Sequence, residues 1–256
     1  MRCCVPLLTA ALSAALALAL PAQSVAAHLT AGDSAYAALR APDALRHYLA
    51  ALAVDSSSVD ALWRAARTES VLAECDSEPA RAAALRTDAE RHARAAVRNG
   101  PKNAQAHFTL AQALGRAALA VPTLDRLPFA SEVHQEVEAC LALDPKHAGC
   151  LHARALWAAE YMRLGTFTRD MANTMTGGKL FATTSWEEAE RDLRSAIAIE
   201  PRRAIHHLDL GRILASQGKF DSARVELEAV LHAPTLDYND PHYRSEATSA
   251  LATLGK

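Results

Sequence analysis

Aromatic residues are scarce in this chain of 256 residues, and Phe, Trp and Tyr together make up only 5% of it. Large rings therefore cannot dominate its core. Neither sign of charge prevails, because the formal net charge is -2. No run of Lys and Arg is long enough to follow a phosphate backbone. We therefore expect no nucleic-acid partner.

Cysteine is also sparse, and two of the five cysteines, Cys3 and Cys4, precede an apolar N-terminal stretch. The others are Cys75, Cys140 and Cys150, an odd and small number for a fold built on disulfides. The chain has instead 50% apolar residues, with alanine throughout. Alanine favours helices and lets neighbouring helices approach closely. This composition predicts an all-α protein that is held together by packing.

The first residues follow the pattern of a secretory signal peptide. Arg2 supplies a positive start, Val5 to Leu20 is uncharged and apolar, and Val25-Ala26-Ala27 offers small residues for cleavage. We predict cleavage after Ala27, so that 1–27 is the signal peptide, and export to the bacterial periplasm or out of the cell. The alternative is a retained membrane anchor, but the apolar stretch is shorter than the roughly 20 residues that a spanning helix needs. No later apolar run could span a membrane.

Helix-stop signals recur along the chain, each after an alanine-rich stretch with helical periodicity. They are Asp55-Ser56, Gly100-Pro101, Asp144-Pro145 and Glu200-Pro201. At fixed distances from each stop stand mostly small residues: Ala44, Ala51 and Ala66; Ala89, Ala96 and Ala111; Val133, Cys140 and Ala155; Ala189, Ala196 and Gly211. This shared phase resembles the tetratricopeptide repeat (TPR), a helix–turn–helix unit of about 34 residues. The resemblance implies that the small residues lie where the helices of a unit touch.

The fold that this implies is a right-handed α-solenoid of TPR-like helix hairpins with a C-terminal capping helix. Only the last unit has the family length, with 34 residues from Ala189 to Ala223. The excess in earlier units falls between the two helices, where longer hairpins would absorb it. The predicted domain, 28–256, then contains units at about 29–56, 57–101, 102–145, 146–201 and 202–235, and a capping helix at 241–254.

The C-terminal half resembles a narrower group. The segments that carry the resemblance are Glu160–Leu164, the Phe167–Phe181 insert, Ser185–Glu190, His206–Gly211 and Asp237–Pro241. Together they are similar to bacterial relatives of the regulator of microtubule dynamics family, a helical-repeat group. In animals that family is linked to microtubules and organelle membranes. A signal peptide would place this chain away from any cytoskeleton, so the microtubule role is not expected here.

The sequence offers no legible catalytic centre. His206 and His207 are adjacent, so on a helix they point about 100° apart and cannot easily share one metal ion. His107 and His207 fall where the TPR family places a large residue that packs between units. Cys140 lies at an internal helix contact, which makes it a small, inert apolar residue. We therefore expect no catalytic residue, no metal and no cofactor.

Two surfaces are candidates for binding a partner. In the TPR family the concave groove is lined by fixed positions of the first helix of each unit, and the candidates there are Trp63, Arg67, Phe108, Gln112, Arg116, His152, Leu156, Leu208 and Arg212. The second is the insertion of the fourth unit, with Phe167, Met171, Met175 and Phe181. The first three are spaced four apart, so a helix would align them, and we expect that side to fold back over the groove edge.

Cys140 and Cys150 lie five residues on either side of Pro145, so an antiparallel helix pair that turns there could join them by a disulfide and leave Cys75 free.

The function that the sequence favours is a non-enzymatic, exported scaffold or adaptor that binds a protein or peptide. One alternative is an architectural subunit of a cell-envelope complex whose groove is filled by its own chain. A weaker alternative is a hydrolase or metal-binding protein that uses surface histidines. The sequence leaves the partner and the oligomeric state open.

Overall fold

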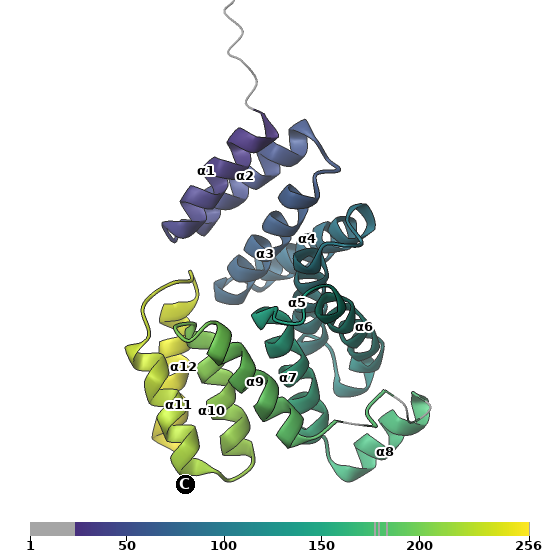
Figure 1. Ribbon diagram of the computed structural model, residues 1–256, viewed down its shortest axis with the longest axis vertical. Coiled ribbons are helices and arrows are strands. Elements are labelled where there is room, and N and C mark those ends of the chain that lie inside the picture. The colour runs from purple at the N-terminus through teal and green to yellow at the C-terminus, as the bar shows by residue number, and fades with distance from the viewer. Residues whose placement is uncertain (1–23, 177, 179, 183, 256) are drawn as a thin grey trace, which may run out of the picture.

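The structure is a computed structural model that describes residues 24–255 except 177, 179 and 183. The predicted signal peptide therefore lies almost entirely outside the described residues. The described part is helical, with short connections (Figure 1). Its elements are α1 (Val25–Ala37), α2 (Ala41–Val54), α3 (Val59–Cys75), α4 (Pro79–Asn99), α5 (Ala104–Leu119), the 3-10 helix η1 (Thr123–Arg126), α6 (Leu127–Leu143), α7 (Ala148–Arg163), α8 (Thr166–Met175), α9 (Trp186–Ile199), α10 (Ala204–Ser216), α11 (Phe220–His232) and α12 (Asp240–Thr253).

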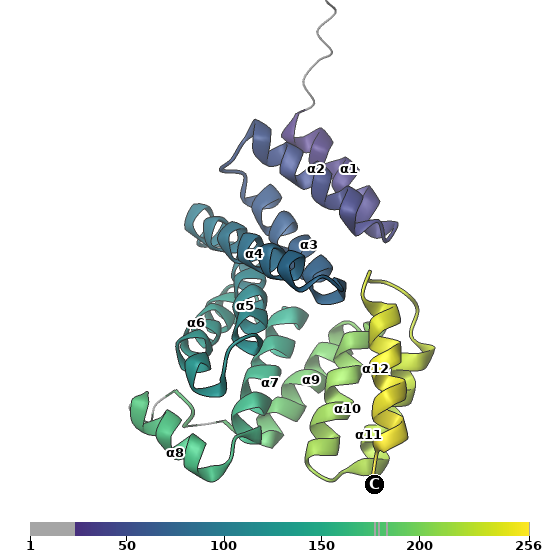
Figure 2. The same ribbon diagram turned by 180° about the vertical axis from the view of Figure 1, so that it is seen from behind.

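The helices pack as consecutive hairpins, which stack into a curved solenoid (Figures 1 and 2). The pairs are α1 with α2, α3 with α4, α5 with α6, α7 with α9, and α10 with α11, and α12 covers the last pair. This confirms the predicted fold of TPR-like hairpins with a C-terminal capping helix. No helix in the described ranges combines the length and hydropathy that crossing a membrane requires.

The small residues identified from the sequence phase all lie inside the hairpins. Ala44, Ala66, Ala96 and Ala155 are fully buried, and Val133, the one larger residue of the set, is 7% exposed. A Cβ added at Gly211 would stand 2.8 Å from Cγ of Leu227 on the facing helix. The helices thus approach so closely at these positions that larger side chains would push them apart.

The extra length of the earlier units is absorbed in two ways. In the second unit both helices are lengthened, to 17 residues in α3 and 21 in α4, against 13 in each of α10 and α11. In the fourth unit an additional helix, α8, stands between α7 and α9. The phase of the repeat is therefore kept while the hairpin tips change.

Side-chain caps fix where the first helix of several units begins. Ser58 Oγ accepts a hydrogen bond from the backbone N–H of Ala61, and Asn103 Oδ1 accepts one from Ala106. His147 Nδ1 accepts one from the N–H of Cys150 at the start of α7. Each satisfies a backbone donor that the first turn of a helix leaves without a partner.

The two ends of the solenoid meet. Asn239, in the connection to α12, is fully buried and donates from Nδ2 to Glu74 at the end of α3, 2.5 Å away. Tyr243 OH donates to the same carboxylate at 3.1 Å, and Tyr36 OH of α1 donates to Asp237 at 3.3 Å. Figures 1 and 2 both show the start of α12 beside α3. The curved stack therefore surrounds its concave side over most of its circumference.

Candidate binding groove

The concave side is a groove with a volume of about 1450 Å³. Its walls come mainly from the first helices of successive units, α3, α5, α7 and α10, together with α12. Small-molecule pockets commonly measure about 300–1,000 Å³. The groove is therefore roomy enough for a segment of a polypeptide.

The structure places most of the predicted groove residues on this surface. Those that line it are Arg67, Phe108, Gln112, Arg116, His152, Leu156 and Arg212. Leu208 was wrongly predicted to face the groove, because it is fully buried in a cluster with Leu227 and Val230. Trp63 is also absent from the lining and packs beside Leu62, with its indole N–H donated to Asp60 at 3.2 Å.

Polar side chains near the N-terminal end of the groove are incompletely bonded. The guanidinium of Arg67 lies over the Tyr36 ring, 3.8 Å from its centroid. Arg116 donates from Nη2 to Glu74 at 2.7 Å. Among the described residues, Arg67 Nε, Arg116 Nη1 and Gln112 Oε1 are buried and have no hydrogen-bond partner. The two arginine atoms are donors, and a buried donor without a partner costs about 1–3 kcal/mol, so they favour an occupant that carries an acceptor. Gln112 Oε1 is itself an acceptor and would take a hydrogen bond from a donor of the occupant.

Phe108 contributes an apolar side chain to the groove lining, and its ring packs between Gly149 and His147. Its ring lies so close to Gly149 that an added Cβ there would stand 2.6 Å from the ring carbons Cε2 and Cζ. On its other side the His147 ring lies 5.1 Å away, between centroids. The glycine lets the outer edge of the aromatic ring approach the backbone of the next unit.

A chain of ionisable groups lies in the groove wall between α7 and α10. His206 Nε2 donates to Glu200 at 3.0 Å, and His206 Nδ1 lies 2.6 Å from His152 Nδ1. His152 Nε2 in turn lies 3.1 Å from Asp209 Oδ2. Burial lowers the pKa of His206 to about 4. Burial alone would raise the pKa of Asp209, but its contacts with His152 and Arg212 bring it below the usual value.

The insertion does not cover the groove as expected. Phe167 is 78% exposed and Met175 is 65% exposed, while Met171 is half-buried. The expectation that this side of α8 would be buried over the groove edge is therefore wrong. Phe181 behaves differently, because its ring stacks on Tyr161 and Trp157, with centroids 4.2 and 5.0 Å apart, and lines the groove. Its burial anchors the insertion on α7.

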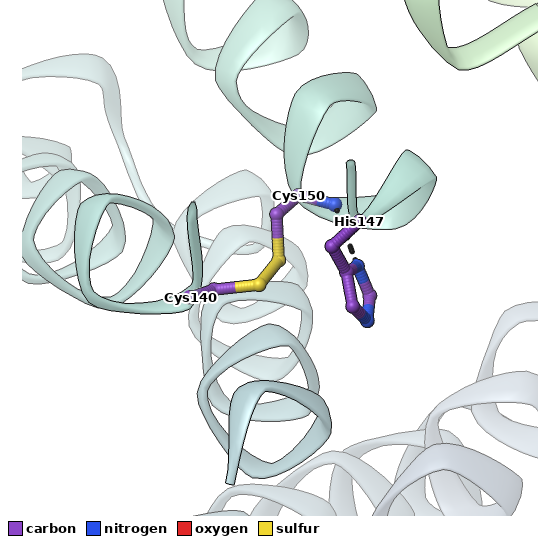
Figure 3. A group of neighbouring side chains, drawn as sticks. All are labelled: Cys140, His147 and Cys150. Carbon is purple, nitrogen blue, oxygen red and sulfur yellow. Dashed lines mark hydrogen bonds between the residues drawn. A yellow bond between two sulfur atoms is a disulfide. The ribbon is translucent and has the colours of Figure 1, made fainter. Parts of the chain in front are cut away.

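Cys140 of α6 and Cys150 of α7 are joined by a disulfide, with their Cα atoms 6.5 Å apart, and Cys75 is free (Figure 3). The imidazole of His147 lies beside the bridge. Both sulfurs are committed to each other, so the three side chains do not form a metal site in this state.

Comparison with known proteins agrees with this architecture. The family model described as Regulator of microtubule dynamics protein 1-3 matches residues 28–255. The chain belongs to this family. The match includes the first repeats, so the likeness seen in the C-terminal half extends over nearly the whole described chain. No curated protein matches the sequence.

Both of the following solved structures are similar to this family member at low sequence identity. The thermophilic TPR protein TTC0263 of Thermus thermophilus is 18% identical, with a TM-score of 0.63 over 89% of this chain and 99% of its own. Pseudomonas aeruginosa pilF is 13% identical, with a TM-score of 0.49 over 91% of this chain and 93% of its own. The first of these shows a shared TPR-type fold and no more.

Several groove residues were missed by sequence reasoning in this family member. They are Tyr36, Glu74, Glu200, His206 and Asp209. Tyr36 lies in the first predicted unit, for which no groove position was assigned, and Glu74 lies beyond the positions that usually line a TPR groove. His206 and Asp209 lie on the same helix as the predicted groove residue Arg212, so a wider choice of positions on that helix would have included them.

Proposed function

We propose that this protein is a non-enzymatic binding protein that holds a segment of a partner protein in its concave groove. The occupant that fits best is a peptide segment with apolar side chains and at least one carboxylate. The observation that carries this proposal is the pair of unbonded donor atoms, Arg67 Nε and Arg116 Nη1, at one end of the groove. A carboxylate could accept from both guanidinium groups.

The neighbouring surface supports the apolar part of the occupant. Phe108 and Leu156 line the groove beyond the arginines, and Phe181 lines it where the insertion meets α7. Fixed aromatic side chains beside a charged group are a common composition of peptide-binding surfaces. A peptide that lies along the groove would contact both kinds of side chain.

The alternative of an architectural subunit with a self-filled groove has less support. The described chain leaves a volume of about 1450 Å³ in the groove, and the insertion packs on α7 with its exposed apolar side turned to solvent. The hydrolase alternative also has less support from the described cysteines, because Cys140 and Cys150 are bridged and Cys75 bonds to Asn239 at 3.2 Å, so none of these three is a free thiolate beside a histidine base.

Export forms part of the proposal. The charged start at Arg2, the apolar stretch Val5–Leu20 and the small residues before His28 support it. So does the disulfide between Cys140 and Cys150, because such bonds persist in oxidising compartments. Cleavage after Ala27 would remove Ser24, the N-cap of α1, and leave most of that helix in place. N-terminal sequencing of the protein from its native host tests the cleavage site.

A defined peptide library tests the binding function. Phage-displayed segments should be selected against the purified protein, and the enriched peptides should be synthesised and titrated by fluorescence polarisation. We expect apolar peptides with an Asp, a Glu or a free C-terminal carboxylate. The Arg67→Gln and Arg116→Gln variants should each bind at least tenfold more weakly, because a charge-assisted hydrogen bond is lost.

Arg98→Gln is the matched control, since Arg98 is exposed on α4 outside the groove. Its affinity should equal that of the wild type. Enrichment of peptides without a carboxylate, or equal affinities for all variants, would contradict the assigned orientation. Failure to enrich any peptide would favour the architectural alternative.

A further inference from the structure

His152 of α7 and His206 of α10 face each other inside the groove wall. They are 9% and 3% exposed, and their Nδ1 atoms are 2.6 Å apart. The two side chains come from neighbouring units, 54 residues apart in sequence. Both belong to the groove lining, so the space between them is reached from the concave side.

The opposite nitrogen of each ring is already committed. His206 Nε2 bonds to Glu200 at 3.0 Å, and His152 Nε2 lies 3.1 Å from Asp209. A carboxylate only accepts, so each Nε2 carries the hydrogen. In the neutral imidazoles each Nδ1 is then a bare lone pair. Two lone pairs that face each other at this distance repel, unless a positively charged group lies between them.

The two carboxylates that bond to the pair are themselves held by arginines. Glu200 lies 3.7 Å from Arg203, and Asp209 lies 3.2 Å from Arg212. The carboxylates are therefore fixed behind the two rings, and the Nδ1 atoms are left facing each other.

We propose that a divalent transition-metal ion of the zinc class binds between Nδ1 of His152 and Nδ1 of His206. Imidazole nitrogens suit zinc, nickel and copper, with Zn–N distances of about 2.0–2.1 Å. Tetrahedral binding would need the two nitrogens about 3.3 Å apart, so the rings would separate by less than about 1 Å. Hydrogen bonds from metal-binding histidines to carboxylates, as with Glu200 and Asp209, fix the ring that binds the ion. The remaining coordination positions open to the groove, where water or a donor group of a bound partner fills them.

Two other histidines differ from the pair, because both of their ring nitrogens bond to oxygen acceptors. His107 bonds to Glu136 at 2.6 Å and to the carbonyl of Pro101 at 3.0 Å. His207 bonds to Glu226 at 2.7 Å and to the carbonyl of Pro201 at 3.1 Å. Both ring nitrogens of each are used, so neither offers a lone pair to a metal ion. His207 is therefore a matched control beside His206 in sequence.

Metal titration of the purified protein without an affinity tag tests the proposal. Zn²⁺ should bind with one equivalent by isothermal titration calorimetry, and Co²⁺ should give visible absorption bands that Zn²⁺ bleaches. We expect His152→Ala and His206→Ala each to weaken Zn²⁺ binding at least tenfold, and His207→Ala to leave it unchanged. A His47→Ala variant is a further control, because it disrupts another close histidine pair, His28 and His47, whose ring centroids are 6.3 Å apart. It should also leave Zn²⁺ binding unchanged. Circular dichroism establishes that each variant is folded.

Nitrogen-15 NMR of the wild-type imidazoles decides the case if a variant does not fold. Coordination should shift the Nδ1 resonances of both histidines on addition of Zn²⁺. No zinc uptake, uptake equal in His206→Ala and wild type, or loss of uptake in His207→Ala alone would overturn the proposal. A single proton shared between the two Nδ1 atoms, with no response to Zn²⁺, would also overturn it. None of these results bears on the Arg67 and Arg116 site, so the two proposals fail independently.

Discussion

The helix cap that His147 provides at the start of α7 depends on pH. Its Nδ1 accepts the backbone N–H of Cys150, which requires an unprotonated ring nitrogen. Burial lowers the pKa of His147, and the charges of Asp144 and Glu200 oppose that shift only in part. The unfolded chain therefore takes up a proton at a higher pH than the folded protein does. This residue's contribution to stability is complete above the unfolded pKa near 6.5 and falls as the pH drops toward the folded pKa.

We predict that His147→Asn reduces the loss of stability between about pH 8 and pH 5. Asparagine caps helices well and does not titrate. The measurement is urea denaturation of both proteins across that range. Ser58→Asn, which changes the cap of α3 without removing a titratable group, should leave the pH slope as in wild type. An unchanged slope in His147→Asn would mean that the cap survives protonation.

The disulfide links two elements, α6 and α7, across the turn between the third and fourth units. Its ten-residue separation closes a short loop, for which the chain-entropy estimate is about 2–3 kcal/mol. We predict that Cys140→Ala with Cys150→Ala lowers the free energy of unfolding by at least about that amount, since the bridge is lost and both side chains are fully buried. Chemical denaturation of the variant, compared with oxidised and reduced wild type, measures it. If reduction costs nothing in the wild type, the bridge does not contribute to stability.

The insertion is anchored by one ring and not by another. Phe181 is 6% exposed, so Phe181→Ala should cost about 3–5 kcal/mol and release the insertion from α7. Phe167 is 78% exposed, and Phe167→Ala should change stability by less than about 0.5 kcal/mol. Denaturation curves and proteolysis within the insertion compare the two. Equal effects would show that the outer side of α8 is also packed.

The elements were predictable to the extent that their contacts are local. Ala66, Ala111, Ala155 and Gly211 could be assigned to helix contacts because hairpin packing repeats with the sequence phase. Leu208 could not be separated from the groove in this way, because interior and groove positions on one helix are only a residue apart. The insertion has no repeat to fix its orientation, which explains why its exposed side was misjudged.

The site itself could not be predicted from the sequence, because it depends on distances between units that the periodicity of the sequence does not give. His152 and His206 lie in different units, and whether their rings meet depends on the rotation between those units. The same holds for Glu74 and Asn239, which are 165 residues apart and meet only because the stack curves through most of a turn. Their contact sets the shape of the groove at the scale of the whole molecule.

The contact between Glu74 and Asn239 joins the two ends of the stack. Glu74 accepts from Asn239, Tyr243 and Arg116, so one carboxylate holds α3, α5 and α12 together. In a solenoid each unit otherwise contacts only its neighbours, so loss of this contact should open the stack without unfolding the repeats. We predict that Asn239→Ala destabilises the protein by about 1–3 kcal/mol, because a buried hydrogen-bonding side chain is removed. It should also increase the radius of gyration in small-angle X-ray scattering while helical content stays constant.

Glu228→Ala, an exposed change on α11, is the control for that experiment and should alter neither quantity. The opened variant also tests whether the closed shape is needed for peptide binding as well as for stability. Arg67 stacks on Tyr36, whose hydroxyl bonds to Asp237 across the closure, so opening should free the Arg67 side chain and weaken binding of a carboxylate peptide. If scattering shows an open molecule that still binds such a peptide with wild-type affinity, the arginines act without the closure. If Asn239→Ala leaves both the scattering and the stability unchanged, packing between neighbouring units alone determines the curvature.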